Sequence, residues 1–280
     1  VSVTFPITAP GHELDGVNLV AWTTTPWTLP TNFALAVGPE IEYAVVSDAA
    51  GEKRYLMASK LIGGYAKELG YESADEVKAA ITKTYLGTEL NGLKYERIFD
   101  FYANPELFDI SNSWQVLVAD YVADTDGTGI VHQAPAYGED DQNVCQAAGI
   151  PTYVSITERG QFNSVIAPYE GQHVFDANKV ITQDLKAMGK LLRQQSYEHS
   201  YPHCWRCHTP LIYYAQPSWY IKTTAIKDDL LRENEGTNWY PETIKWGRYG
   251  DWLNNNVDWA LSRNRYWGTP LPIWRCPEGH

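Results

Sequence analysis

The chain has 280 residues, a length that allows one large domain or two unequal ones. Hydrophobic residues make up 44% of it and charged residues 20%, the composition of a folded globular protein rather than a disordered or fibrous one. No apolar run reaches the roughly 18 to 20 residues of a membrane span, and no basic-then-apolar signal pattern opens the chain. We therefore expect a cytoplasmic protein with no membrane partner.

The charge of the chain is distributed unevenly. The net charge of −12 argues against binding nucleic acid by diffuse electrostatics, because that mode depends on neutralising many phosphates with Lys and Arg. Residues 1–200 hold 13 Lys and Arg against 26 Asp and Glu, whereas residues 201–280 hold 9 against 8. This split suggests two functional units, of which the acidic one can hold a nucleic acid only through few and local contacts.

Short strands dominate the first half of the chain. Segments rich in β-branched and aromatic residues, separated by Gly, Pro, Asn and Asp, predict strands at 17–22, 33–37, 41–47, 114–119 and 129–133. Apolar residues at three- and four-residue steps predict helices at about 60–69, 74–82, 139–148 and 176–188. Many short strands with long connections predict a β-dominated α+β fold. Its centre would be a closed antiparallel β-barrel with peripheral helices, rather than a doubly wound parallel sheet.

The composition changes near residue 200, where a cysteine knuckle begins. Four cysteines are too few for a disulfide scaffold of this size, and Cys204 and Cys207 form a C-x-x-C pair, so metal binding is favoured over a disulfide. Structural zinc takes four tetrahedral ligands, of which this pair supplies two, with His203 and His208 flanking it. The alternative is a pair of free cysteines. An aromatic strand (QPSWYIKTT), a helix at about 225–232 and a Trp-rich stretch follow.

The first motif with chemical potential is WTTTPWTLPTN, from Trp22 to Asn32, directly after an apolar strand. Three threonines at a strand end expose hydroxyls and backbone N–H groups, because Pro26 favours an extended conformation at Thr25. Such a loop can hold a ribose or an ester carbonyl. The alternative is an ordinary Thr-rich strand and turn.

The second motif is GTGIVHQAPAYGEDD, from Gly127 to Asp141. A Gly-rich turn leads into an apolar strand that carries His132, and a loop with Pro and Gly follows. The acidic residues that end the motif are also explained by a helix N-terminus, where carboxylates favour the positive end of the dipole. His132 is equally explained as a half-buried histidine with satisfied hydrogen bonds.

WTTTPWTLPTN and GTGIVHQAPAYGEDD resemble, in order and spacing, the two signature loops of the isoleucyl-tRNA synthetase editing domain. In the related valyl and leucyl enzymes the third threonine is typically arginine and the position of His132 is typically another residue. Thr25 with His132 therefore favours the isoleucyl family. Tyr137 departs from the pattern, because many members have histidine there.

The resemblance extends to the C-terminal part of the chain. YPHCWRCHTPLIYYAQPSWYI resembles the zinc-binding return segment of the family, and NWYPETIKWGRYGDWLNNNVDWALSRNRYWGTPLPIW resembles the stretch that re-enters the synthetic core. The implied division is an editing domain at 1–200, a zinc-ribbon-like return segment at 201–245, and a segment at 246–280 leading to the Rossmann core. The HIGH and KMSKS motifs for ATP are absent from this sequence, so it is expected to be a piece of an enzyme that uses ATP only at full length.

The resemblance also implies a metal arrangement and a set of partners. The second cysteine pair of the family lies upstream of this segment, while Cys276 with its trailing PEGH looks like half of another knuckle. Structural zinc is thus possible, with Cys204, Cys207 and Cys276 as candidate ligands, and no cofactor is expected for editing. The expected partners are the 3′ end of the isoleucine tRNA carrying valine and the remainder of the synthetase, and the segment is expected to be monomeric.

The implied reaction removes valine from that tRNA, and possibly from valyl-adenylate. Isoleucine and valine differ by one methylene, so a synthetic site discriminates them poorly and a second site must remove errors. No G-x-S-x-G elbow or Cys–His pair is evident, so direct attack by water is preferred over an acyl-enzyme. The general base stays open among Asp141 through a water, His132 and a ribose hydroxyl of the substrate.

By resemblance, each candidate side chain has an expected role. Asp141 would anchor the α-ammonium of the aminoacyl group, with Asp140 as its substitute. His132, helped by Trp22, would line the pocket that excludes isoleucine. Three further roles complete the site: Thr23, Thr24 and Thr25 would orient the terminal adenosine and stabilise the oxyanion, and Asn32 would brace the loop. Of these residues, Asp141, His132, Thr24 and Thr25 are the catalytic candidates.

Three other interpretations compete with this one. The first is a metal-dependent hydrolase with His132, Asp140 and Asp141 as ligands. The second is a non-enzymatic zinc ribbon that binds RNA through residues 201–280. The third is a valyl- or leucyl-type editing domain, which Thr25 and His132 disfavour.

Overall fold

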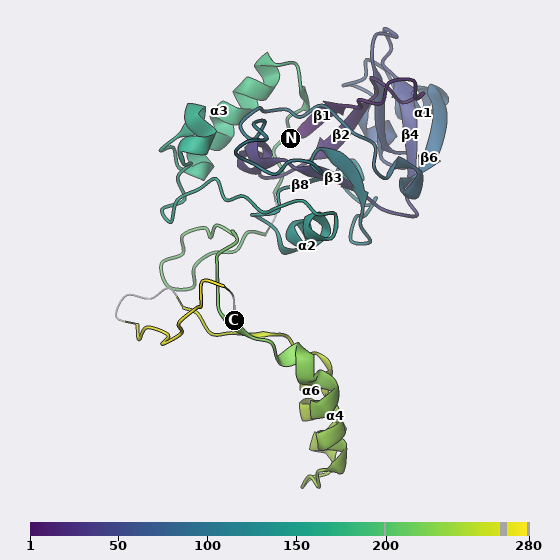
Figure 1. The fold of residues 1–280 in the computed structure, drawn as a ribbon. Coiled ribbons are helices and arrows are strands. Elements are labelled where there is room, and N and C mark those ends of the chain that lie inside the picture. The colour runs from purple at the N-terminus through teal and green to yellow at the C-terminus, as the bar shows by residue number, and fades with distance from the viewer. Residues whose placement is uncertain (199, 264–267, 279–280) are drawn as a thin grey trace. The chain divides into compact units, whose positions relative to one another are not determined.

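The computed structural model describes residues 1–198, 200–263 and 268–278. The chain divides into two compact units, Val1–Ala215 and Gln216–His280 (Figure 1). Across the described ranges, no helix has the length and apolar character needed to cross a membrane.

A nine-stranded sheet forms the centre of the first unit. Its main path runs β6-β4-β5-β2-β8-β3-β7, with β1 added to β2 and β9 added to β1. The strands are β1 (Ser2–Pro6), β2 (Asn18–Trp22), β3 (Ala34–Val37), β4 (Glu42–Ser47), β5 (Arg54–Ala58), β6 (Ile81–Leu86), β7 (Gln115–Val118), β8 (Ile130–Gln133) and β9 (Leu191–Arg193). Each of the five strands predicted from the sequence is present, and β1, β5, β6 and β9 are additional.

The sheet is mixed, so the predicted antiparallel pairing is wrong. The pairs β2–β5, β2–β8 and β3–β7 are parallel. Long connections explain them, because a parallel pair needs a crossover of a dozen or more residues, and about 75 residues separate β3 from β7. Within the described residues the path ends at β6 and β7, which do not pair, so a closed barrel is not formed there.

The sheet forks at β2. One edge of β2 pairs with β1 along its full length. Its other edge is shared: Asn18 and Leu19 pair with β5, and Trp22 pairs with Val131 of β8. The fork brings the start of the first motif directly beside the strand of the second motif.

Both faces of the central strands are buried, which explains their almost uniformly apolar sequences. Successive residues of β2 illustrate this, since Leu19 packs into the main core while Val20 packs into a second cluster. The second cluster includes Met57 of β5 and Val77 of the helix α1. Figure 1 shows α1 beside β4 and β6.

Helices cover the sheet and connect its strands. The α-helices of the first unit are α1 (Ala74–Ala79), α2 (Glu139–Ala147) and α3 (Val174–Ala187), and its 3-10 helices are η1 (Pro26–Thr31), η2 (Ile62–Tyr65), η3 (Gly87–Leu90) and η4 (Ser164–Tyr169). The helices predicted at 139–148 and 176–188 are confirmed. The one predicted at 60–69 is a 3-10 turn instead, because the adjacent Gly63 and Gly64 disfavour an α-helix. The one at 74–82 stops early, because Ile81 begins a strand.

The second unit contains short elements. They are β10 (Tyr220–Ile221), η5 (Thr223–Ile226), α4 (Lys227–Gly236), α5 (Thr243–Trp246), α6 (Arg248–Asn254) and β11 (Trp259–Ala260). β10 and β11 pair antiparallel. A zinc ribbon over 201–245 is not seen in the described residues: this range is divided between the two units after Ala215, and no group of side chains there could hold a metal. The predicted division at residues 200 and 245 stays a prediction.

Candidate functional site

The three threonines that follow β2, Thr23–Thr25, form a tight turn that we call the threonine loop. The Thr23 hydroxyl accepts the backbone N–H of Thr25 at 3.1 Å, which closes the turn. Thr24 is exposed, whereas Thr23 and Thr25 are half-buried. Helix η1 begins at Pro26, and its Trp27 N–H donates to Oδ1 of Asn178 on α3 at 2.9 Å. The loop is therefore held from both sides and presents Thr24 outward.

A cavity of about 500 Å³ lies between the threonine loop and α3. Trp22 stands at its wall, and the ring of Tyr197 meets the Trp22 ring edge-on with centroids 5.1 Å apart. The lining includes Trp22, Thr23, Thr24 and Pro26 from the first motif, and Asn178, Lys179, Thr182, Gln183 and Lys186 from α3. Three of the predicted substrate-binding residues thus share one cavity.

His132 lies on β8 and is only 6% exposed. Its Nε2 is 2.8 Å from Oγ1 of Thr28, and its Nδ1 is 3.1 Å from Nδ2 of Asn32. Burial lowers the pKa of His132 to about 4, so the ring is neutral at pH 7. The structure therefore joins two predicted site residues, His132 and Asn32, and links them to the first motif. His132 is not among the residues that line the cavity beside the loop.

Asp141 lies in the first turn of α2, half-buried. Its Oδ2 accepts the backbone N–H of Ala134 at 2.8 Å, which attaches the helix to the chain just beyond β8. Burial, reinforced by the nearby charge of Asp140, raises the pKa of Asp141 to about 6, against the lowering effect of the Ala134 hydrogen bond. Asp140 itself is exposed. No hydrogen bond recorded for the described residues joins Asp141 to the threonine loop.

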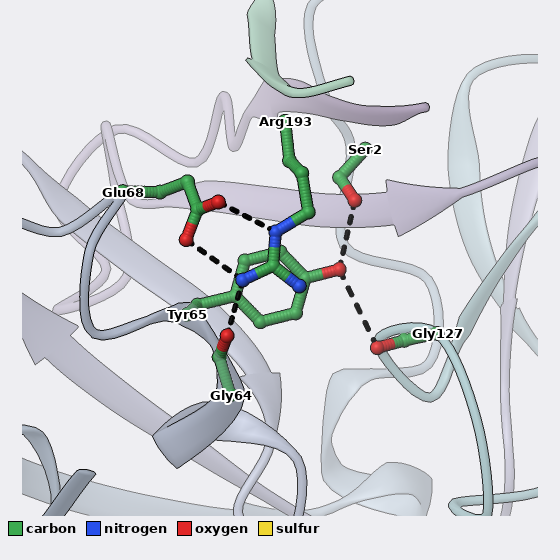
Figure 2. A network of polar contacts seen from close by, with 6 residues as sticks. All are labelled: Ser2, Gly64, Tyr65, Glu68, Gly127 and Arg193. Atoms are coloured by element: carbon green, nitrogen blue, oxygen red, sulfur yellow. Dashed lines mark hydrogen bonds and ion pairs between the residues drawn. The ribbon is translucent and has the colours of Figure 1, made fainter. Parts of the chain in front are cut away.

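A polar cluster contacts the turn that leads into β8 (Figure 2). The Tyr65 hydroxyl bonds to Oγ of Ser2 at 2.7 Å and donates to the carbonyl of Gly127 at 3.4 Å. Arg193 lies over the Tyr65 ring, 3.6 Å from its centroid, and makes two 2.7 Å bonds to the carboxylate of Glu68. We call Tyr65, Glu68 and Arg193 the arginine clamp.

Four residues to which we assigned no site role from the sequence also form the site. Thr28 and Tyr95 complete the hydrogen bonds around His132 and Asn32. The ring of Tyr137 meets Trp27 edge-on at 4.7 Å, and its hydroxyl accepts the Ser155 N–H at 2.9 Å. Thr28, Trp27 and Tyr137 lie within the two motifs, so their position in the sequence could have marked them as site residues. Tyr95 lies outside both motifs, and nothing in the sequence around it marks it as a site residue.

The cysteine pair lies in a turn that is closed by backbone hydrogen bonds. The Cys204 N–H donates to the Thr209 carbonyl at 2.8 Å, and His208 N–H donates to the Cys204 carbonyl at 2.8 Å. Hydrogen bonds from Thr209 lower the pKa of the exposed Cys207 thiol to about 7, which favours the thiolate that binds metal. Cys276 lies in the other unit.

Acidic, His and Cys side chains do not gather into a metal site in the described part of the chain. Within the ranges 1–198, 200–263 and 268–278, nowhere do three or more of them form a group that could hold a metal. The alternative of a metal site at His132, Asp140 and Asp141 therefore lacks a suitable donor arrangement, and both ring nitrogens of His132 already have hydrogen-bond partners.

Solved structures share the fold of the first unit. The crystal structure of GlLeuRS-CP1 matches with a TM-score of 0.50 at 13% identity, over 70% of this chain and 99% of that one. At this identity the likeness concerns the fold alone, a mixed sheet with covering helices.

Curated relatives match over almost the whole chain. The isoleucine–tRNA ligase of Leifsonia xyli subsp. xyli is 50% identical over 295 residues, covering 99% of this chain and 26% of the relative. That of Streptomyces coelicolor is 50% identical over 280 residues, covering 100% and 25%. The chain thus spans about a quarter of the length of these relatives, and the predicted resemblance to isoleucyl-tRNA synthetases is confirmed. Since the model of the class I tRNA synthetases (I, L, M and V) also matches residues 11–280, the chain belongs to this family.

Proposed function

We propose that this chain is the editing segment of an isoleucine–tRNA ligase, which hydrolyses valine from the 3′ end of the isoleucine tRNA. One observation carries the proposal: the His132–Thr28 hydrogen bond joins the two motifs beside a cavity lined by the threonine loop. The curated relatives named as isoleucine–tRNA ligases support the choice of tRNA. Attachment of isoleucine with ATP would belong to the full-length enzyme.

The proposed chemistry is attack by water on the aminoacyl ester. Thr23, Thr24 and Thr25 would orient the terminal adenosine and stabilise the developing oxyanion through hydroxyl and backbone N–H groups, and Trp22 would line the pocket for the amino-acid side chain. Asp141 would bind the α-ammonium by a charge-assisted hydrogen bond, which separates an aminoacyl ester from other esters. The ion pair between Asp141 and the α-ammonium would offset the free-energy cost of burying the charged carboxylate.

The geometry narrows the choice of general base. His132 is neutral, but both ring nitrogens are engaged and its ring is buried, which supports a structural role next to the threonine loop rather than proton transfer. The pKa of Asp141, raised to about 6 by burial, lies close to neutral pH, where a general base acting through a water is effective. Asp141 or a ribose hydroxyl of the substrate is thus favoured as the base.

We also infer that zinc, if bound, is structural. Cys204 and Cys207 would supply two thiolate ligands, and the remaining ligands would come from segments outside this chain. Cys276 would belong to a second knuckle. Zinc would hold the turn at 204–209 in place and has no role in the proposed hydrolysis.

The test is deacylation of two substrates, valine and isoleucine, each charged on the isoleucine tRNA. Wild type should release valine faster than isoleucine, Asp141→Ala should lose this activity, and His132→Ala should lose selectivity. Asp140→Ala is the matched control, since the exposed neighbour should retain activity. Should wild type release neither amino acid even when this segment is part of a full-length synthetase, the proposed function is wrong.

A further inference from the structure

The side-chain amide of Asn32 has one possible orientation. Asn32 is 7% exposed, and its Nδ2 lies 2.9 Å from the backbone carbonyl of Ala34. Because a carbonyl can only accept, the atom facing it must be the NH₂ group. The Oδ1 atom then faces Tyr95, whose hydroxyl donates to it at 2.8 Å. Each atom of the buried amide is thus satisfied in this orientation and in no other.

The orientation of Asn32 determines the protonation of His132. The second hydrogen of the Asn32 NH₂ group points to Nδ1 of His132, 3.1 Å away. This nitrogen must accept, so it carries no proton. A neutral imidazole has one N–H, which therefore lies on Nε2. A proton on Nδ1 would face the Asn32 donor inside the core, where an unsatisfied polar group is costly.

The Nε2–H group has a defined partner in the first motif. Thr28 lies 2.8 Å away and accepts through Oγ1. The Thr28 hydroxyl then donates its own proton to the carbonyl of Thr25 at 3.0 Å, and the Thr28 N–H donates to the same carbonyl at 3.2 Å. The direction of every bond is therefore consistent from Tyr95 to the threonine loop.

We propose that Asn32 holds His132 as the neutral Nε2–H tautomer, and that His132 positions the threonine loop through Thr28. Asn32 and Thr28 are positioning residues in this scheme, since they act on the loop through another group. His132 joins β8 to the loop rather than exchanging protons with substrate. The effect of these residues on catalysis rests on the proposed function, whereas the assignment of the His132 tautomer is independent of it.

The first experiment measures the tautomer directly, without substrate. Long-range ¹H–¹⁵N correlation on the ¹⁵N-histidine-labelled chain at pH 7 distinguishes protonated from bare ring nitrogens, and the signals that vanish in His132→Gln identify this ring among the seven histidines. Wild type should show a protonated Nε2 and a bare Nδ1. A protonated Nδ1 in wild type would overturn the proposal.

Two variants separate the groups that set the tautomer. Asn32→Asp replaces the donor by an acceptor of the same shape, so Nδ1 should become protonated. Tyr95→Phe is the control, because the Ala34 carbonyl still orients the Asn32 amide and the wild-type pattern should persist. If Asn32→Asp leaves Nδ1 bare while circular dichroism shows a folded protein, Asn32 does not set the tautomer and the proposal is wrong.

The last experiment tests transmission to the loop. Thr28→Val keeps the shape of the side chain but removes both of its hydrogen bonds, so kcat for valine deacylation should fall by about 10- to 100-fold, as for a displaced reacting group. The tautomer should stay unchanged, and Thr28→Ser should restore the rate. An unchanged rate in Thr28→Val, with active wild type, would overturn transmission. Inactive wild type with a protonated Nε2 would contradict the proposed function and leave the tautomer assignment standing.

Discussion

Asp141 illustrates how a buried carboxylate can oppose the stability of the fold. Its carboxylate accepts the Ala134 N–H, and its burial disfavours the charged form. A carboxyl whose pKa is raised in the folded state stabilises the protein below the unfolded-state pKa, and this contribution is lost as the pH rises through the folded-state pKa. At neutral pH the charged Asp141 therefore destabilises the fold.

We accordingly predict that Asp141→Asn is more stable than wild type at pH 7. The pKa rises from 3.8 to about 6, which corresponds to a gain of about 1 to 3 kcal/mol on removing the charge. The gain should shrink as the pH falls from about 6 towards 4, where wild type becomes protonated. Urea unfolding of wild type and Asp141→Asn at pH 7 and at about pH 4 measures this difference in stability. A variant that is less stable than wild type at pH 7 would contradict the cost assigned to the charge.

Gly127 is a second residue with a defined physical constraint. Its φ of +69° lies in the left-handed region, and an added Cβ would lie 2.7 Å from the ring of Trp22. Both effects oppose any larger residue. Gly171 has a similar φ of +76° but nothing within 4 Å of the position of a Cβ.

The pair Gly127→Ala and Gly171→Ala separates backbone strain from the Trp22 contact. Gly171→Ala should cost about 1 kcal/mol, the backbone term alone. Gly127→Ala should cost about 2 to 4 kcal/mol, since overpacking adds to that term, and it should shift the tryptophan fluorescence. Equal losses of unfolding free energy in the two variants would show that Trp22 does not depend on Gly127.

At the scale of elements, the arginine clamp ties together segments far apart in the chain. Arg193 ends β9, Tyr65 ends η2, and the Tyr65 hydroxyl reaches the Gly127 carbonyl in the turn before β8 (Figure 2). Side chains of Arg193 and Glu68 are only 21% and 20% exposed, so their ion pair is more shielded than a surface pair. Through the Tyr65 ring, the ion pair is linked to the turn that leads into β8.

We predict that Glu68→Gln lowers the free energy of unfolding by about 1 to 2 kcal/mol, because it leaves the Arg193 charge without its carboxylate. The hydrogen bond from Arg193 lowers the pKa of Glu68, so this contribution is present above its unfolded-state pKa. It is lost as the pH falls through the lowered pKa, where the two proteins should converge.

The matched control for the clamp is Asp124→Asn. Its partner Lys60 is 65% exposed, and removal of such a surface pair should change stability by less than about 0.5 kcal/mol. Comparable losses of unfolding free energy in Asp124→Asn and in Glu68→Gln would mean that the ion pair of the arginine clamp acts as an ordinary surface pair.

At the scale of the whole molecule, the two units differ in how well they bury apolar groups. The three core clusters draw only on residues of the first unit. Large aromatic side chains of the second unit are exposed, among them Tyr240 at 91% and Trp274 at 87%. Because curated relatives are about four times longer, we expect further segments of a full-length synthetase to cover these side chains.

We predict that the first unit folds alone. A chain ending at Ala215 retains all three core clusters and every residue proposed for hydrolysis. Its thermal unfolding transition should remain cooperative and shift by only a few degrees, and it should bind less of the apolar dye ANS than the full chain. A non-cooperative transition measured by circular dichroism would show that the first unit requires the second.

Much of the secondary structure was predictable because it depends on local patterns. The strands around Val20, Leu35 and Val131 follow from short apolar runs between turn residues, and α3 follows from its three- and four-residue spacing. Strand direction was not predictable, since a parallel pair has no local signature. The antiparallel barrel was wrong for that reason. The roles of the candidate site residues stay predictions, including those of Asp140 and the three cysteines.

The sequence by itself determined the family and the two motifs, because hydroxyl, imidazole and carboxylate groups at fixed spacings can be recognised without coordinates. It also determined the predominance of short strands. Only the tertiary structure decided which partners each group has. Asn32 meets Tyr95 across 63 residues and His132 across 100. Burial, tautomer and pKa depend on such distant neighbours, which the fold brings together and no local pattern encodes.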